Sequence, residues 1–282
     1  MRRFFFWLCI SGLPLWLLGA DKPKPQPPLR SRAEVQAVLS QRSETGSAKL
    51  HPLNIVLVAS VQDHGPGEHD YPAWQKAWNP LLSQSPQVTV TNAWKWPTDD
   101  QFAHADIVVC YFWNHAWTNE VYKEVEAFLA RGGGLVLLHS SSIADQEPEA
   151  LAERIGISFQ PNRSKYRHGE LDLNFITQKN DPITAGLPRT IHFLDETYWP
   201  MIGDTSRVQA LATAREDGKP WPMVWTFTRG KGRVFGTVLG HYLWTYDDPY
   251  FRILVLRGIA WAAREPVSRF EPLATVGVRF KD

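Results

Sequence analysis

The chain has 282 residues, of which 44% are hydrophobic, and its formal net charge is +1. This length and apolar content allow a substantial core in one large domain or two small ones. The near-zero charge argues against nucleic acid as a partner, because binding it would require a basic field. The sequence also lacks the acidic tail that would suggest a chaperone-like partner.

Residues 1–20 have the pattern of a secretory signal peptide. A basic start is followed by an apolar run, and small residues precede a cleavage position after Ala20. The run is too short to span a bilayer comfortably, although an uncleaved anchor stays open. Removal of this peptide would leave Cys110 as the only cysteine, so no intrachain disulfide could form. We therefore expect an exported protein, periplasmic or extracellular, with no stable membrane span after signal removal.

The remaining chain is expected to contain one domain. Residues 21–50 are expected to form a Pro-rich linker and a short helix, which begins at the capping-box spacing of Ser31 and Glu34. Neither an internal repeat nor a domain boundary interrupts residues 51–266, and residues 267–282 are expected to be a C-terminal tail.

Apolar strands alternate with helices in the first half of the domain. Strands are predicted at 54–60, 88–91, 106–112 and 135–138. Helices are predicted through Trp74 and Trp78, from Thr98 and from Thr118. This alternation predicts an α/β protein with a doubly wound, mainly parallel sheet and helices on both faces. The unbroken apolar run 135–138 follows three glycines and is typical of a central strand.

The second half changes in pattern after His139. A helix is predicted at 147–155, and a second, amphipathic helix closes the domain at 249–264. Strands are predicted between them at 170–176, 191–199, 208–213, 223–228 and 233–239, the last two joined by a hairpin turn. The strand 233–239 leads into His241, which repeats the apolar strand followed by histidine at His139.

Histidines follow several of the predicted strands. The carboxyl ends of parallel strands meet at one sheet edge, where ligands bind in open α/β sheets. Five of the nine histidines fall at such ends, together with two further polar residues: His64, His69, His115, His139 and His241, with Asp70 and Asn114. Each could instead be an ordinary hydrogen-bonded turn histidine. His51, His104 and His192 look incidental.

Two chemistries suit such a cluster. Imidazoles with one carboxylate, for which Glu196 is the best candidate, form a divalent metal site, with zinc favoured. The same groups without a metal could act as general acid and base near neutral pH. His168 could join the site or lie on the surface. The sequence lacks His-Glu-x-x-His, Gly-x-Ser-x-Gly, P-loop and GxGxxG motifs, and Cys110 lies in an apolar strand, which argues against a reactive thiol.

Several segments, in this order, carry a family resemblance. They are Gly-Gly-Gly-Leu-Val-Leu-Leu-His-Ser at 132–140, Asp-Pro-Ile-Thr-Ala-Gly-Leu-Pro at 181–188, Asp-Glu-Thr-Tyr at 195–198, Gly-Lys-Gly-Arg-Val-Phe at 230–235 leading to His241, and a closing segment at 251–263. With them the chain, from about 54 to 264, resembles the trehalose-utilisation (ThuA-like) family, a branch of the class I glutamine amidotransferase-like superfamily. The resemblance implies a flavodoxin-like sheet.

The resemblance also implies what the site does. His139 stands where true amidotransferases carry their nucleophilic cysteine, so glutamine hydrolysis by a thiolate is excluded. The family implies a role in sugar breakdown, linked to disaccharides that a partner dehydrogenase oxidises to 3-keto sugars. The export signal departs from the cytoplasmic members, which leaves the identity of the disaccharide open.

Our leading hypothesis is an exported carbohydrate-processing enzyme that acts on a sugar or 3-keto-glycoside. Its catalytic residues would be His139, Glu196 and His241, and these with His168 would hold any metal. Substrate-binding candidates are His64, His69, Asp70, Trp113, Asn114, His115 and Tyr198. Hydrolysis, elimination and isomerisation all stay open. The alternatives are a non-catalytic sugar-binding module on the same fold and a homodimeric scaffold for a partner enzyme.

Overall fold

The computed structural model describes residues 26–41, 50–176 and 181–282. The predicted signal peptide, residues 1–20, lies outside the described residues. No helix in the described part of the chain is both long and apolar enough to cross a membrane.

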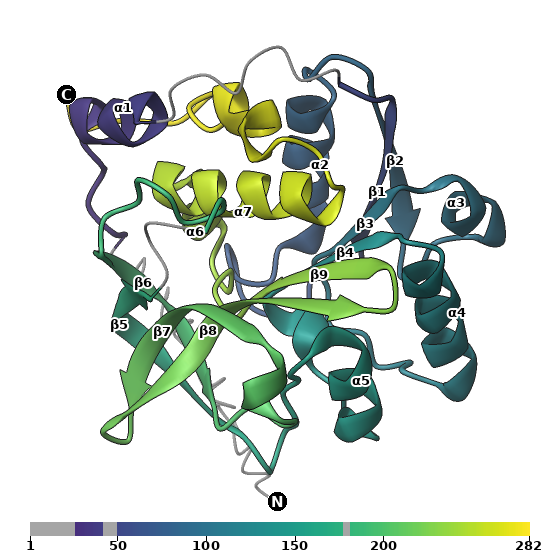
Figure 1. Cartoon of the computed structure of the whole chain (residues 1–282). Helices are drawn as coiled ribbons and strands as arrows, with labels where there is room; N and C mark the ends of the chain where they lie inside the picture. The colour runs from purple at the N-terminus through teal and green to yellow at the C-terminus, as the bar shows by residue number, and fades with distance from the viewer. Residues whose placement is uncertain (1–25, 42–49, 177–180) are drawn as a thin grey trace, which may run out of the picture.

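A nine-stranded sheet runs through the described part of the molecule in the order β2-β1-β3-β4-β9-β8-β7-β5-β6 (Figure 1). Its strands are β1 (Leu53–Ala59), β2 (Val88–Trp94), β3 (Ile107–Cys110), β4 (Gly134–Leu138), β5 (Lys165–Phe175), β6 (Thr190–Trp199), β7 (Gln209–Glu216), β8 (Lys219–Arg229) and β9 (Gly232–Thr237).

The sheet has two halves of different character. The strands β2-β1-β3-β4-β9 pair in parallel, in the order 2-1-3-4-5 of a doubly wound sheet. From β9 onward, β8, β7, β5 and β6 pair antiparallel. The prediction of a mainly parallel sheet is therefore wrong for the second half. Hairpins replace crossover helices there, and antiparallel neighbours need only short turns.

Helices cover both faces of the parallel half, as predicted. Figure 1 shows α2 and α7 on one face and α4 and α5 on the other. The α-helices are α1 (Arg32–Ser40), α2 (Tyr71–Leu82), α3 (Asp99–His104), α4 (Asn119–Ala130), α5 (Pro148–Ile155), α6 (Leu243–Asp247) and α7 (Pro249–Ala262), and 3₁₀ turns are η1 (His139–Ser142), η2 (Thr205–Arg207) and η3 (Val267–Leu273). Ser31, Thr98 and Thr118 are the N-caps that the sequence predicts for α1, α3 and α4.

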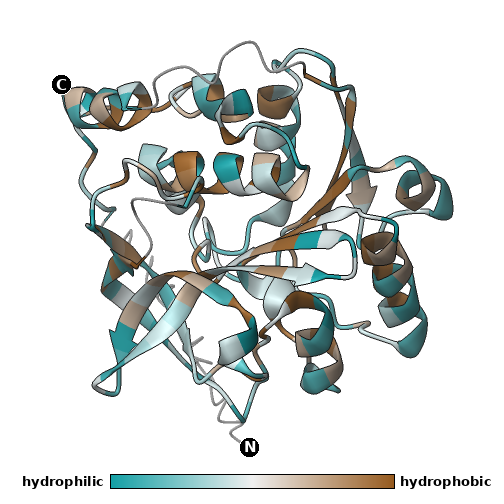
Figure 2. Cartoon of the chain, viewed as in Figure 1, coloured by the Kyte–Doolittle hydropathy of each residue, from teal (hydrophilic) through white to brown (hydrophobic). Residues whose placement is uncertain are grey.

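The core lies where α7 crosses the parallel strands. Every residue of β3 and β4 is buried, and almost every residue of α7 is buried too. Figure 2 shows hydrophobic colour on the central strands, whereas the outer turn of the β7–β8 hairpin is hydrophilic. Gly258 lets α7 approach β9, because a Cβ there would lie 2.6 Å from the Phe235 ring. This packing fixes the ends of β4 and β9, from which the site is built.

The two ends of the described chain lie together. The Lys281 amide donates to the Arg30 carbonyl at 3.1 Å, and the Arg32 amide donates to Asp282 Oδ1 at 2.9 Å. Within the segment expected to be a tail, η3 packs on α7 and Glu271 accepts a 2.7 Å hydrogen bond from the buried Arg257 guanidinium. Residues 267–273 therefore belong to the packed body of the protein.

Candidate functional site

Four buried side chains converge at the carboxyl edge of the parallel strands. They are His69 from the β1–α2 loop, His139 at the start of η1, His241 after β9, and Glu196 in β6. Each offers one ligand atom, and these four atoms all lie within 4.8 Å of one another. We call these four residues the His/Glu cluster.

The distances inside the His/Glu cluster are short. His69 Nε2 lies 2.8 Å from His139 Nε2, and Glu196 Oε2 lies 3.2 Å from His139 Nε2 and 3.1 Å from His241 Nδ1. Glu196 Oε1 lies 3.2 Å from His168 Nε2. One carboxylate thus joins three histidines that are far apart in sequence.

Two of the histidines sit on unusual backbone. His69 has a φ of 43° and His139 a φ of 51°, both in the left-handed region that non-glycine residues seldom adopt. Such conformations cost on the order of 1–3 kcal/mol and are found preferentially at functional sites. At His139 this backbone turns the chain sharply from β4 into η1, with the imidazole completely buried.

Hydrogen bonds outside the His/Glu cluster fix the protons of two rings. His139 Nδ1 donates to the Val238 carbonyl at 2.5 Å, because a carbonyl only accepts. His69 Nδ1 donates to Asp63 Oδ1 at 2.6 Å. Burial would raise the pKa of Asp63, but the hydrogen bonds from His69 and His64 outweigh it and lower this pKa to about 2. Asp63 is therefore ionised and accepts.

These bonds leave lone pairs facing one another. Burial lowers the pKa of His69 to about 3, so near neutral pH the ring is uncharged and its Nε2 carries a lone pair. The Nδ1 of His139 is occupied by the Val238 carbonyl, so Nε2, 2.8 Å from His69 Nε2, is the ring atom that this histidine offers to a metal. Lone pairs at this distance repel unless a cation lies between them. A proton can bridge only two of the four donor atoms, whereas a metal ion can contact them all.

The donor set fits a divalent metal. Burial would raise the pKa of Glu196, but its contacts with His139, His168 and His241 outweigh it and hold this pKa well below the usual range, so the carboxylate is ionised. Burial lowers the pKa of His241, although Glu196 Oε2, 3.1 Å from its Nδ1, acts in the opposite direction. Tetrahedral zinc, with bonds of about 2.0–2.2 Å, separates its donors by roughly 3.3–3.5 Å. Three of the donor pairs here are 2.8–3.2 Å apart and every pair lies within 4.8 Å, so small movements of the side chains would fit them to the ion.

Asp195 holds the loop that carries His241. Its buried carboxylate accepts hydrogen bonds from the backbone amides of Gly240 and His241, both at 3.0 Å, and from the Thr245 hydroxyl at 2.5 Å. It also accepts from the Glu196 amide at 2.7 Å. Asp195 therefore positions two members of the His/Glu cluster at once.

Aromatic hydroxyls surround the His/Glu cluster. The Tyr198 hydroxyl lies 3.1 Å from His139 Nε2, and burial raises the pKa of Tyr198 well above its usual value, so the proton stays on oxygen. The Tyr71 hydroxyl lies 3.0 Å from both Asp63 Oδ2 and Ser140 Oγ. The Tyr242 hydroxyl lies 3.1 Å from His168 Nδ1.

The structure brings some predicted site residues together. His69, His139, His241, Glu196 and Tyr198 meet directly, and His168 adjoins them through Glu196. His64 lies at the rim, with its ring centroid 5.4 Å from that of His241. His69 was predicted to bind substrate rather than a metal, but its Nε2 lies inside the His/Glu cluster.

Other predicted residues lie outside it. His115 is exposed, pairs with Asp145 at 2.6 Å and packs on the ring of Trp113. The Asn114 carboxamide oxygen accepts a hydrogen bond from the Ala116 amide, and Asp70 is the N-cap of α2. Within the described ranges, no contact joins Trp113, Asn114 or His115 to the His/Glu cluster.

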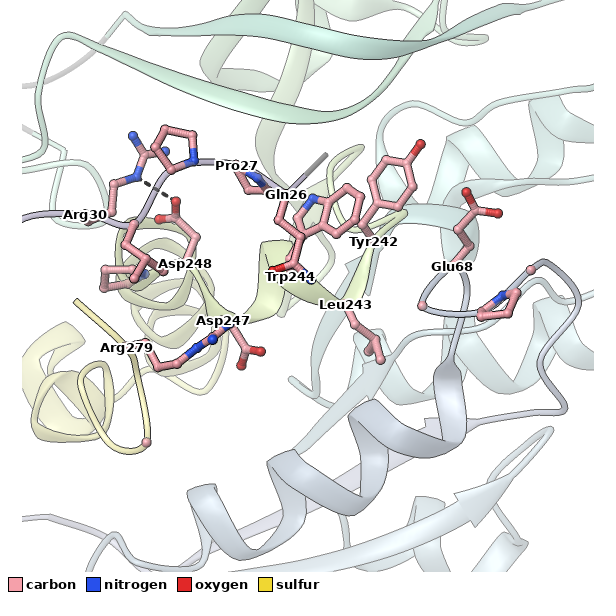
Figure 3. Close-up of a pocket in the computed structure, with 17 residues that line it drawn as sticks. Gln26, Pro27, Arg30, Glu68, Tyr242, Leu243, Trp244, Asp247, Asp248 and Arg279 are labelled. Carbon is pink, nitrogen blue, oxygen red and sulfur yellow. Dashed lines mark hydrogen bonds and ion pairs between the residues drawn. The ribbon is translucent and has the colours of Figure 1, made fainter. Parts of the chain in front are cut away.

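Several residues of the site were not predicted from the sequence. Asp63 and Glu68 stand in the same polar loop as His64 and His69, and Asp195 directly precedes Glu196. The sequence signal that could have identified them is an acidic side chain next to a candidate histidine or glutamate. Glu68 Oε1 lies 3.7 Å from His241 Nε2. Glu68 and Tyr242 also line a cavity that opens beside the site (Figure 3).

Solved structures share this fold. A putative ThuA-like protein from Parabacteroides merdae is 23% identical, with a TM-score of 0.60 over 76% of this chain and 90% of that one. Another from Bacteroides uniformis is 14% identical, with a TM-score of 0.61 over 80% and 99%. A β-galactosidase from Rahnella is 15% identical, with a TM-score of 0.52 over 76% of this chain but 32% of the enzyme. At these identities the likeness shows the fold alone.

The family assignment comes from the sequence itself. No curated protein matches the chain. The ThuA family, described as trehalose utilisation, matches residues 55–262, a range that contains every member of the His/Glu cluster. This match covers most of the chain and gives it a role related to carbohydrates. The chain belongs to the ThuA family.

Proposed function

We propose that the protein is an exported, metal-dependent enzyme that cleaves a 3-keto-glycoside. The observation that carries the proposal is the convergence of three imidazole nitrogens and one ionised carboxylate, all buried, at spacings that suit zinc. The family supports a sugar as substrate. Export and signal cleavage after Ala20 are parts of this proposal that rest on the sequence, and a partner dehydrogenase rests on the family resemblance. A homodimer and a flavodoxin-like fold for the parallel half also belong to the proposal.

His69, His139, His241 and Glu196 would hold the metal. The metal would supply a Lewis acid that polarises the substrate carbonyl. Around it, Asp63 and the Val238 carbonyl orient two ligand rings, and Tyr198 keeps a proton beside His139. His168, whose side chain is 37% exposed, is the ring placed to take up or release a proton at the edge of the site.

Elimination suits this site better than direct hydrolysis. Glycoside hydrolases generally use two carboxyl groups, one of them protonated to serve as an acid. Glu196 cannot act as the protonated acid, because its contacts with histidines keep the carboxylate ionised. In a 3-keto-glycoside the carbonyl makes the C2 hydrogen acidic. Loss of that proton gives an enolate, the C1–O bond then breaks, the C1–C2 double bond forms, and the departing oxygen takes up a proton.

A comparison of His139→Ala with His115→Ala tests the proposal. His139 belongs to the His/Glu cluster, whereas His115 is an exposed histidine outside it. We expect His139→Ala to lose bound zinc, measured by mass spectrometry of the purified protein, and to lose at least a hundredfold in turnover of 3-keto-trehalose. His115→Ala should match wild type. An enone absorption in the product would identify elimination.

Unchanged turnover in His139→Ala would overturn the catalytic assignment. A wild-type protein that binds the sugar without converting it would favour the non-catalytic binding module. In that case sugar binding should survive the loss of His139 and His241, because a module does not need the metal ligands.

A further inference from the structure

A cavity of about 810 Å³ opens next to the His/Glu cluster (Figure 3). Its walls come from four parts of the chain: residues 26–30, residues 65–68, residues 242–244 with 247–249, and Gly277 with Arg279. The volume falls within the range of about 300–1,000 Å³ that is typical of small-molecule sites. Nothing in the proposed chemistry uses this space.

An aromatic pair forms one side of the cavity. The rings of Tyr242 and Trp244 stack with centroids 4.1 Å apart and an interplanar angle of 20° (Figure 3). The Trp244 indole donates to the Leu194 carbonyl at 2.9 Å, which fixes its orientation. Tyr242 covers one face of Trp244, and the indole, only partly buried, lines the cavity with its remaining surface. A preoriented indole offers a flat surface on which sugar C–H groups can stack.

Polar groups complete the lining. Glu68, Asp247 and Arg279 lie around the aromatic pair in Figure 3, and the Arg30 guanidinium donates to Asp248 at 2.7 Å. Carboxylate and guanidinium groups can each accept or donate two hydrogen bonds in one plane, which suits neighbouring sugar hydroxyls. A purely apolar ligand would remove water from these charged groups without replacing its hydrogen bonds, so the lining favours a polar occupant.

The cavity adjoins the candidate metal site through two of the residues that line it. Glu68 lines it and lies 3.7 Å from His241 Nε2, and Tyr242 lines it and lies 3.1 Å from His168 Nδ1. Their backbones also pair through an isolated bridge. A molecule that occupies the cavity therefore lies against two residues that contact His241 and His168.

We propose that this cavity is the subsite for the second ring of a disaccharide, the leaving sugar, while the oxidised ring lies at the His/Glu cluster. This inference rests on the proposed function, in which the family resemblance implies a disaccharide, and adds to it the place in the structure where the leaving sugar binds. Trp244 is the stacking residue of this subsite.

Two kinds of substrate and one pair of tryptophan variants test the subsite. Trp94, half-exposed on the edge strand β2 and outside the cavity lining, is the matched control for Trp244. We expect Trp244→Ala to lower kcat/KM for 3-keto-trehalose about tenfold, as for the loss of one stacking contact, and to leave methyl 3-keto-α-glucoside unchanged. Trp244→Phe should keep most of the activity on 3-keto-trehalose, and Trp94→Ala should act as wild type on both substrates.

A binding measurement separates this inference from the proposed function. Saturation-transfer NMR with trehalose, maltose and cellobiose reports binding without turnover. If wild type converts no keto-sugar, the proposed function fails, yet loss of disaccharide signal in Trp244→Ala but not in Trp94→Ala would still support the subsite. Equal losses on both keto substrates, an unchanged disaccharide signal in Trp244→Ala, or no disaccharide signal in wild type would each overturn it.

Discussion

At the scale of single residues, the decisive feature is how the protons are distributed among the imidazoles. Asp63 and the Val238 carbonyl accept from the Nδ1 atoms of His69 and His139, so both rings present Nε2 to the same point. Outer partners of this kind fix the tautomer of metal-binding histidines and raise their basicity. In the proposed metal site, the function of Asp63 would be to orient His69.

Asp63→Asn should weaken metal binding without unfolding the protein. The neutral amide is a poorer acceptor for His69 Nδ1, so zinc affinity should fall about 10–100-fold, measured by competition with a chelator. Asp70→Asn is the control, because Asp70 caps α2 and asparagine caps helices equally well. Equal zinc affinities in the two variants would contradict an orienting role for Asp63.

Much of the site could be predicted from residue types and their positions, but not which of the histidines enter the His/Glu cluster. The sequence predicts His139 and His241 together, because each follows an apolar strand and the strands β4 and β9 are parallel neighbours. It cannot predict that His69 enters the His/Glu cluster while His64, five residues earlier, stays at the rim. That difference depends on the left-handed backbone at His69, which no local pattern in the loop specifies.

At the scale of elements, the close contact between α7 and β9 fixes the position of the turn that carries His241. Gly258 on α7 faces Phe235 on β9, and this strand leads directly into the Gly240–His241 turn. Alanine normally favours helix over glycine by up to about 1 kcal/mol. Packing and propensity therefore act in opposite directions at position 258.

Gly258→Ala should destabilise the protein by about 1–3 kcal/mol, because the new methyl group would lie 2.6 Å from the Phe235 ring. Chemical denaturation measures the change. A double-mutant cycle with Phe235→Leu provides the control: the smaller side chain should relieve most of the penalty, which gives a coupling energy above about 0.5 kcal/mol. A stabilised Gly258→Ala variant would show that propensity outweighs packing.

Element types were easier to predict than pairing. Alternation of apolar strands and amphipathic helices sufficed for the parallel half. In the second half the strands were predicted, but whether they run parallel or antiparallel depends on which strands pair, and the sequence pattern does not show that. The short helix α6 (Leu243–Asp247) was not predicted, because five residues are too few to show helical periodicity.

At the scale of the whole molecule, ligand binding at the His/Glu cluster couples to stability. A metal that binds the native but not the unfolded chain stabilises it by about 2.7 kcal/mol at a hundred times its Kd. Zinc should therefore raise Tm by several degrees in wild type and in His115→Ala. The chelator EDTA should reverse the shift, and His139→Ala should not respond. An equal response in His139→Ala would place the bound zinc elsewhere.

The division of the sheet has a consequence for how the protein matures. The three imidazoles follow strands of the parallel half, whereas Glu196 and His168 belong to β6 and β5 at the far end of the antiparallel half. A folding intermediate with only the parallel half in place would hold nitrogen ligands but no anionic one. In the proposed metal site, full affinity for the ion would require both halves of the sheet to have formed, and a bound ion would then hold the two halves together against local opening.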